Sequence, residues 1–145
     1  MNIRDLVKRA YETAKEKGWH DKPATFGDRM ALIHSEVSEA LEAFRSLDND
    51  SHDCIRQPVY FNPETGYLTR DRGHYVPHKK ANSDEYELYD EWVLNKPEGV
   101  VAELADVVIR VADLCGLYGI DLDQAIEEKM AYNSTRPYRH GGKQL

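Results

Sequence analysis

The chain has 145 residues, 41% hydrophobic and 31% charged, which predicts a single globular domain (residues 1–145) rather than a disordered segment. Its net charge of −7 argues against non-specific nucleic-acid binding, which depends on lysine and arginine. No apolar run approaches the roughly 18 residues of a membrane span. Because the charged start "MNIRDLVKRAYE" is also no secretory signal, we expect a cytoplasmic protein that binds neither nucleic acid nor membrane.

Two helices are predicted in the first third of the chain. Apolar residues recur at helical spacing from Asn2 to Lys17, with Asn2 as the N-cap and Gly18 as the stop. The loop "WHDKPATFGD" follows. A second helix is then predicted from about Thr25 to Phe44.

The segment from about 48 to 96 is polar and rich in tyrosine, proline, glycine and asparagine. Within it, "PVYFNPETGYLTRDRGHYV" predicts a β-hairpin that turns at "NPETG". The alternative is a long surface excursion. Because insertions of this length often act as lids or contact partners, both roles stay open.

Two further helices are predicted in the last third. "NKPEG" predicts the start of the third, with Pro97 in its first turn and Glu98 at the positive end of the helix dipole. This helix is expected to end within 116–119. Asp121 is the expected N-cap of the fourth helix, and Gln124 completes a capping-box pattern. Four helices predict an all-α fold.

Four charged residues of the third helix share one narrow stripe. At 100° per residue, Glu103, Asp106, Arg110 and Asp113 fall within a sector of about 80°. The other positions are almost all apolar, and a helix of that kind is expected to be buried. The stripe is therefore predicted to face an internal site, the alternative being an ordinary solvated stripe. Arg110 and Asp113 are left open between substrate contact and an internal ion pair.

A second acid pair stands in the predicted second helix. Glu36 and Glu39 of "EVSE" lie at the margin of its apolar face, three residues apart like Glu103 and Asp106. Four converging carboxylates need cations, and an all-oxygen ligand set suits Mg²⁺, Mn²⁺ or Ca²⁺ rather than Zn²⁺; we expect Mg²⁺, with Mn²⁺ as an alternative. A di-iron centre needs Glu-x-x-His on two helices, and no glutamate here has a histidine three residues later.

The fourth helix carries two polar residues in its apolar stripe, Lys129 and Asn133. We expect them to face an anion held by the metal, while a snorkelling lysine is the alternative. Arg136 follows in a basic tail that either clamps phosphates or is solvated.

These segments resemble the MazG-like all-α nucleotide pyrophosphohydrolases. The resemblance rests on "SEVSEALEAF" and "ELADVVIRVADLCGLYGIDLDQAIEEKMAYN", and covers roughly residues 1–47 and 97–143. It implies a four-helix bundle protomer in a homodimer or dimer of dimers. It also implies Mg²⁺-dependent cleavage of nucleoside triphosphates to a monophosphate and pyrophosphate. The insertion at about 48–96 departs from the family pattern and leaves the choice of base and sugar open.

The resemblance also implies roles for individual residues. Its metal ligands are Glu36, Glu39, Glu103 and Asp106, its phosphate contacts Lys129 and Asn133, and its base contacts Trp19, His20 and Phe26. For the chemistry, Glu39 is our predicted catalytic base. Lys129, with either Arg110 or Arg136, would stabilise the leaving pyrophosphate.

The predicted function is therefore hydrolysis of (d)NTP to (d)NMP and pyrophosphate, as nucleotide-pool housecleaning. One alternative is a non-catalytic helical dimer, stabilised by metal, that acts as an interaction or regulatory module. The other is a pyrophosphohydrolase for a different phosphate anhydride, such as a phosphoribosyl-nucleotide.

Overall fold

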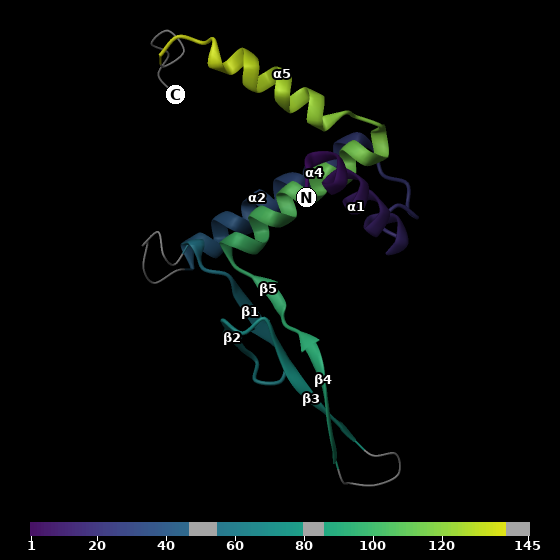
Figure 1. The fold of residues 1–145 in the computed structure, drawn as a ribbon, viewed down its shortest axis with the longest axis vertical. Helices are drawn as coiled ribbons and strands as arrows, with labels where there is room; N and C mark the ends of the chain where they lie inside the picture. The colour runs from purple at the N-terminus through teal and green to yellow at the C-terminus, as the bar shows by residue number, and fades with distance from the viewer. Residues whose placement is uncertain (47–54, 80–85, 139–145) are drawn as a thin grey trace. The chain divides into compact units, whose positions relative to one another are not determined.

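The computed structural model describes residues 1–46, 55–79 and 86–138. Its helices are α1 (Ile3–Glu16), α2 (Phe26–Arg45), α4 (Val100–Tyr118) and α5 (Leu122–Ser134). Its strands are β1 (Val59–Asn62), β2 (Tyr67–Thr69), β3 (Gly73–Lys79), β4 (Tyr86–Leu94) and β5 (Lys96–Glu98) (Figure 1). The four predicted helices are confirmed within a residue or two, except at the start of α4.

The all-α prediction is wrong for the insertion. Strand β1 pairs antiparallel with β2 and with β5, while β3 and β4 form a separate antiparallel pair. Strand pairing gives hydrogen-bond partners to the backbone of a long connection that contains no helical apolar stripe. In the part of the chain that the structure describes, no helix has both the length and the apolar character to cross a lipid bilayer.

The chain divides into two compact units. The first comprises Met1–Ile33 and Val108–Leu145, and therefore α1, the start of α2, the end of α4 and α5. The second comprises His34–Val107, with the rest of α2, all five strands and the start of α4. Both predicted acid pairs belong to the second unit.

The helix caps follow the sequence closely. The side chain of Asn2 accepts a hydrogen bond from the Asp5 amide at 2.8 Å, as the N-cap prediction requires. Asp121 likewise accepts from the Gln124 amide at 3.1 Å. The capping box is only half formed, since the Gln124 side chain donates to Glu128 at 2.7 Å instead of reaching back to the cap.

Helix α4 begins at Val100, so the prediction of Pro97 and Glu98 in its first turn is wrong. Pro97 lies opposite Tyr60 in the β1–β5 pair. Proline has no N–H to donate, and β5 is an edge strand, where a proline is tolerated. Gly99 then takes a φ of +81°, a conformation that glycine adopts easily, and the helix starts directly after it.

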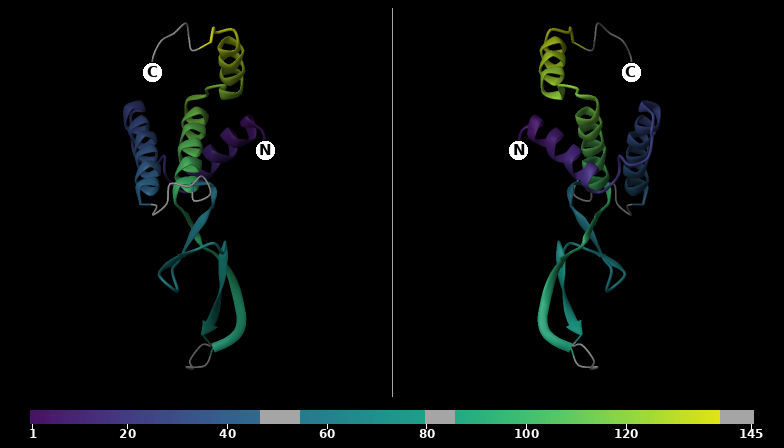
Figure 2. Two further views of the ribbon diagram at one scale, coloured as in Figure 1. Left: turned by 90° about the vertical axis from the view of Figure 1, so that its left-hand side faces the viewer. Right: turned by 90° about the vertical axis from the view of Figure 1, so that its right-hand side faces the viewer.

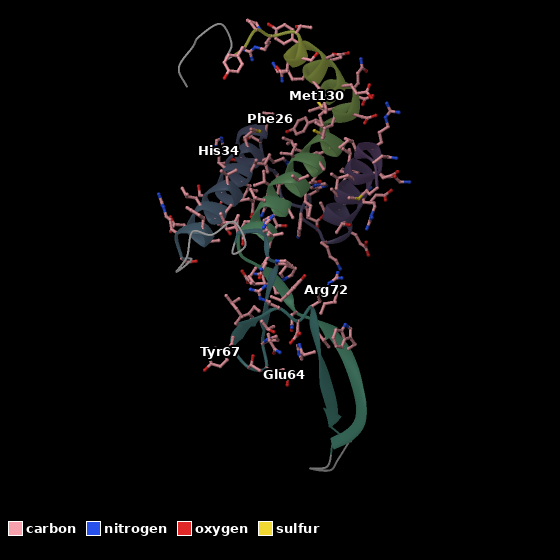
Figure 3. The ribbon with its side chains drawn as sticks, turned by 60° about the vertical axis from the view of Figure 1, so that its left-hand side comes forward. Phe26, His34, Glu64, Tyr67, Arg72 and Met130 are labelled. Atoms are coloured by element: carbon pink, nitrogen blue, oxygen red, sulfur yellow. The ribbon has the colours of Figure 1, made fainter. Side chains whose placement is uncertain are left out.

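The predicted hairpin is confirmed as β1–β2. Asn62 lies opposite Tyr67, and the Asn62 side chain accepts hydrogen bonds from the amides of Glu64 and Thr65 inside the turn. Gly66 closes the turn with a φ of +72°. Glu64 and Tyr67 lie at this hairpin (Figure 3), where 76% of Tyr67 is exposed.

Strands β3 and β4 form a longer two-stranded ribbon, paired from Gly73 with Leu94 to Lys79 with Tyr86 (Figure 2). Its base is fastened by Asn95, which is 2% exposed. The Asn95 side chain bonds His74 Nδ1 at 2.6 Å and donates to the carbonyl of residue 71 at 2.8 Å. These bonds fix the backbone that leads into β5.

The buried side chains of the helices are mostly small. They are Ala10 and Ala14 of α1, Ile33 and Ala40 of α2, and Ala112, Leu114 and Cys115 of α4. Leu104 and Val108 of α4 are each 52% exposed, so the prediction of a helix buried nearly all round is wrong for a single chain. Small residues permit close helix contact: a Cβ at Gly116 would lie 2.6 Å from the Cβ of Tyr11.

We therefore expect Gly116→Ala to lower the free energy of unfolding by about 1–3 kcal/mol, since the backbones of α1 and α4 must separate. Gly27→Ala is the matched control, because its Cβ would meet nothing closer than 3.6 Å and alanine favours a helix. Urea denaturation of both variants measures the difference. Equal stability of the two would contradict tight packing at Gly116.

Candidate metal centre

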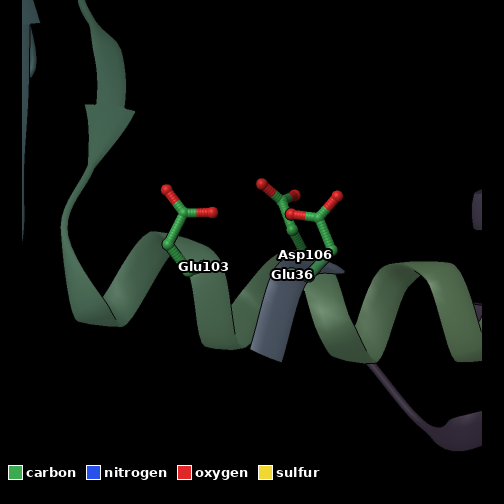
Figure 4. Close-up of side chains that lie close together, drawn as sticks. All are labelled: Glu36, Glu103 and Asp106. Atoms are coloured by element: carbon green, nitrogen blue, oxygen red, sulfur yellow. The ribbon is translucent and has the colours of Figure 1, made fainter. Parts of the chain in front are cut away.

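Three carboxylates converge in the second unit. Glu36 comes from α2, and Glu103 and Asp106 come from successive turns of α4. One oxygen of each lies within 4.8 Å of the others (Figure 4). The spacing of three residues puts Glu103 and Asp106 on one face of α4, and Glu36 meets that face from the other helix.

The three ligand candidates differ in exposure. Glu36 is 5% exposed, Glu103 is half-buried, and Asp106 is exposed. Glu36 is also one of two buried polar residues in the described part of the chain, the other being Asn95. The cluster is therefore buried at Glu36 and accessible to solvent at Asp106. A cation held there could also contact a substrate that arrives from solvent.

The charges of the cluster act on one another. Burial raises the pKa of the Glu103 carboxyl above its ordinary value, and the neighbouring carboxylates of Glu39, Asp106, Glu36 and Glu98 raise it further. Ionisation of Glu103 therefore costs free energy in the folded protein. A bound cation would remove that cost.

The donor set fits a hard divalent cation. Each residue offers carboxylate oxygen, and no histidine or cysteine joins the cluster among the described residues. Mg²⁺ binds oxygen at about 2.1 Å, so two of its ligands lie at most about 4.2 Å apart. The separations found here need only small side-chain movements to reach that value. Oxygen ligands suit Mg²⁺ or Mn²⁺ rather than Zn²⁺.

The fourth predicted ligand, Glu39, lies outside this triad. Its side chain is exposed and accepts a hydrogen bond from the Ser35 hydroxyl at 3.0 Å. It is close enough that its charge raises the pKa of Glu103. Its roles as metal ligand and catalytic base stay predictions.

Two residues of β5, Lys96 and Glu98, do not belong to the acid motifs of the sequence, yet their strand leads directly into α4. Lys96 Nζ lies 2.7 Å from Glu98 Oε1. That hydrogen bond and charge raise the pKa of Lys96, and the charges of Glu103 and Asp106 add to the effect. Residues two apart on a strand face the same side, so "KPE" would have shown the pair had it been taken as a strand.

His20, a predicted base contact, is instead paired inside the first unit. Its Nε2 lies 2.9 Å from Asp113 Oδ1, and both side chains are largely buried, at 12% and 14% exposed. The Tyr11 ring lies 5.3 Å away. Asp113 is therefore an internal partner. Together with Arg29 and others, Asp113 and Arg110 line a cavity of about 30 Å³.

The other predicted substrate contacts also lie in the first unit. Trp19 is 58% exposed, and Phe26 packs edge to face on Tyr118 at 5.4 Å. Helix α5 has no buried residue, so the apolar stripe that carries Lys129 and Asn133 is not covered in the single chain.

Lys129 lies 5.6 Å from the Tyr132 ring, and Arg136 is exposed beyond the helix. These residues belong to the first unit and the triad to the second. The substrate contacts predicted for them therefore stay predictions.

No protein-family model matches the chain, and no curated protein or solved structure is significantly similar to it. The metal-centre interpretation therefore rests on the carboxylate geometry and the sequence pattern.

Because its pKa is raised, Glu103 holds a proton more readily in the folded chain than in the unfolded one. Stability without metal should fall as the pH rises from below the ordinary value of 4.5 through the raised one. We expect Glu103→Gln to raise the melting temperature in EDTA at pH 7, and to abolish stabilisation by Mg²⁺. Glu42→Gln, which alters an exposed carboxylate bonded to Arg45, should change neither. A lower melting temperature for Glu103→Gln in EDTA would contradict this.

Proposed function

We propose that the chain is a magnesium-dependent nucleotide pyrophosphohydrolase, which hydrolyses nucleoside triphosphates to monophosphate and pyrophosphate. The convergence of Glu36, Glu103 and Asp106 supports this most directly. The motif resemblance to the MazG-like enzymes, with two acid pairs on separate helices, supports the reaction and the four-helix bundle. A cytoplasmic role in clearing unwanted nucleotides belongs to the same proposal.

The residues divide the work by position. Glu36, Glu103 and Asp106 would hold Mg²⁺, which neutralises phosphate charge and makes a water more acidic. Glu39 accepts the proton of the attacking water. The water oxygen bonds to the α-phosphorus, the bond from that phosphorus to the bridging oxygen breaks, and pyrophosphate leaves with the electron pair.

The proposed enzyme is a homodimer or a dimer of dimers. Four apolar side chains on the part of α2 and α4 that carries the acids are 37–52% exposed: Val37, Leu41, Val101 and Leu104. Burial of apolar surface favours association at about 25 cal/mol per Å². A second copy covering these side chains would bury them, as the resemblance implies.

The decisive assay follows both pyrophosphate and monophosphate from a panel of dNTPs and NTPs with Mg²⁺. We expect the pair Glu36→Gln and Glu103→Gln, combined in one protein, to lower kcat/KM by about a hundredfold or more, since the metal contributes several kcal/mol. Glu42→Gln is the control and should keep full activity. Release of orthophosphate by the wild type would contradict the proposed bond cleavage.

The same measurements separate the alternatives. A non-catalytic metal-stabilised module would gain thermal stability from Mg²⁺ but turn over no nucleotide. A pyrophosphohydrolase for another phosphate anhydride would hydrolyse a phosphoribosyl-nucleotide in preference to every triphosphate of the panel.

We expect Leu41→Lys to shift the protein towards monomer, because a lysine placed in an apolar interface must be desolvated. Light scattering after size exclusion measures the mass. The control is Leu68→Lys on β2, where the leucine is 62% exposed on the hairpin. The same oligomer in both variants would exclude Leu41 from the interface.

A further inference from the structure

A lysine–glutamate pair stands beside the metal centre on an element that the acid motifs do not include. Lys96 and Glu98 lie on β5, paired with β1 through the registers Val59–Glu98 and Phe61–Lys96. Only Gly99 separates β5 from α4, and the Gly99 carbonyl accepts from the Glu103 amide at 3.1 Å. The strand therefore ends at the first turn of α4, the turn that carries Glu103.

Lys96 brings positive charge to the strand that leads into α4. Its Nζ lies 2.7 Å from Glu98 Oε1, and only Gly99 separates this strand from the helix that carries Glu103 and Asp106. The hydrogen bond and charge of Glu98 raise the pKa of Lys96, and the charges of Glu103 and Asp106 add to the effect. The N-terminus of α4 begins four residues after Lys96 and carries the positive end of the helix dipole. A polyphosphate held by a cation at the triad is most highly charged at its terminal phosphates, and these are the groups that such surroundings favour.

The lysine is held in a way that permits exchange. Its side chain is 74% exposed, and its 2.7 Å bond to Glu98 is a surface pair, of a kind worth little in water. A phosphate oxygen carries a negative charge comparable to that of the carboxylate, so it can replace Glu98 as the partner of the Lys96 ammonium. Replacing a weak carboxylate partner by a phosphate costs little, while the strand keeps the lysine stem in place.

Building on the proposed function, we infer that Lys96 is a phosphate-binding residue. When substrate binds, its ammonium exchanges Glu98 for the two phosphates that depart as pyrophosphate. Glu98 acts as the partner that holds Lys96 beside the triad until the substrate arrives. The contact to the leaving group would then come from β5 of the insertion, in the same unit as the acids.

The test is calorimetric titration of inorganic pyrophosphate into the protein with saturating Mg²⁺. Lys96→Met should weaken pyrophosphate binding about tenfold or more, the effect of losing a charge-assisted hydrogen bond. Binding of a nucleoside monophosphate should change by less than about twofold. Lys96→Arg should restore much of the affinity, because it keeps the charge.

The matched control is Lys8→Met. The Lys8 side chain is 73% exposed and pairs with Glu12 at 3.9 Å. Lys8→Met therefore removes a similar lysine–glutamate pair from another part of the chain. It should bind pyrophosphate like the wild type. Mn²⁺ titration without pyrophosphate is the second control, and Lys96→Met should bind the metal at least as tightly as the wild type.

Glu98→Gln tests the exchange itself. Without a competing carboxylate, Lys96 is available from the start, so Mg²⁺–pyrophosphate should bind more tightly than in the wild type. Weaker binding would overturn the proposed role of Glu98.

The outcomes separate this inference from the proposed function. Unchanged pyrophosphate affinity in Lys96→Met, or loss of Mn²⁺ binding in that variant, overturns the inference while leaving hydrolysis standing. No pyrophosphate binding by the wild type also overturns it. Selective weakening in Lys96→Met supports the inference even if no triphosphate is hydrolysed, in which case only the proposed function fails.

Discussion

Repulsion between like charges is the constraint around which the second unit is arranged. Glu36, Glu103 and Asp106 bring carboxylate oxygens within 4.8 Å of one another, and Glu36 is buried. Burial and neighbouring acids raise the pKa of Glu103, so the folded chain maintains this cluster at an energetic cost. Apolar residues of similar size at these positions would avoid that cost. A cation bound by the three carboxylates would remove that cost, which supports the proposed metal site.

In the inference drawn above, the insertion contributes Lys96 and Glu98 to the same site. Its strands give partners to the backbone, and β5 ends at Gly99, whose positive φ turns the chain into α4. The same strand that sets the start of α4 carries Lys96 and Glu98 beside Glu103. In the proposed enzyme, one short edge strand would therefore link substrate recognition to the position of the metal ligands.

The first unit has a different character. Its polar pair, His20 with Asp113, is internal and largely buried, and Gly116 of α4 packs tightly against Tyr11 of α1. In the pair of His20 with Asp113, the sequence pattern predicts the histidine as a substrate contact and leaves the aspartate open. A charged residue on the same helical stripe as the metal ligands need not share their function, because the stripe passes through both units.

Local patterns in the sequence determined the helices, the Asn2 and Asp121 caps, the Asn62–Gly66 turn and the two acid pairs, because each depends on contacts within a few residues. Tertiary structure decided which carboxylates meet. The sequence pattern predicts both Glu36 and Glu39 as metal ligands, but only Glu36 lies in the triad. It also decided that Pro97 lies in a strand, because pairing with β1 depends on residues nearly forty positions away. For the same reason Lys96 could not be found by spacing along the chain: its neighbours at the site are set by strand pairing, and only the fold brings them together.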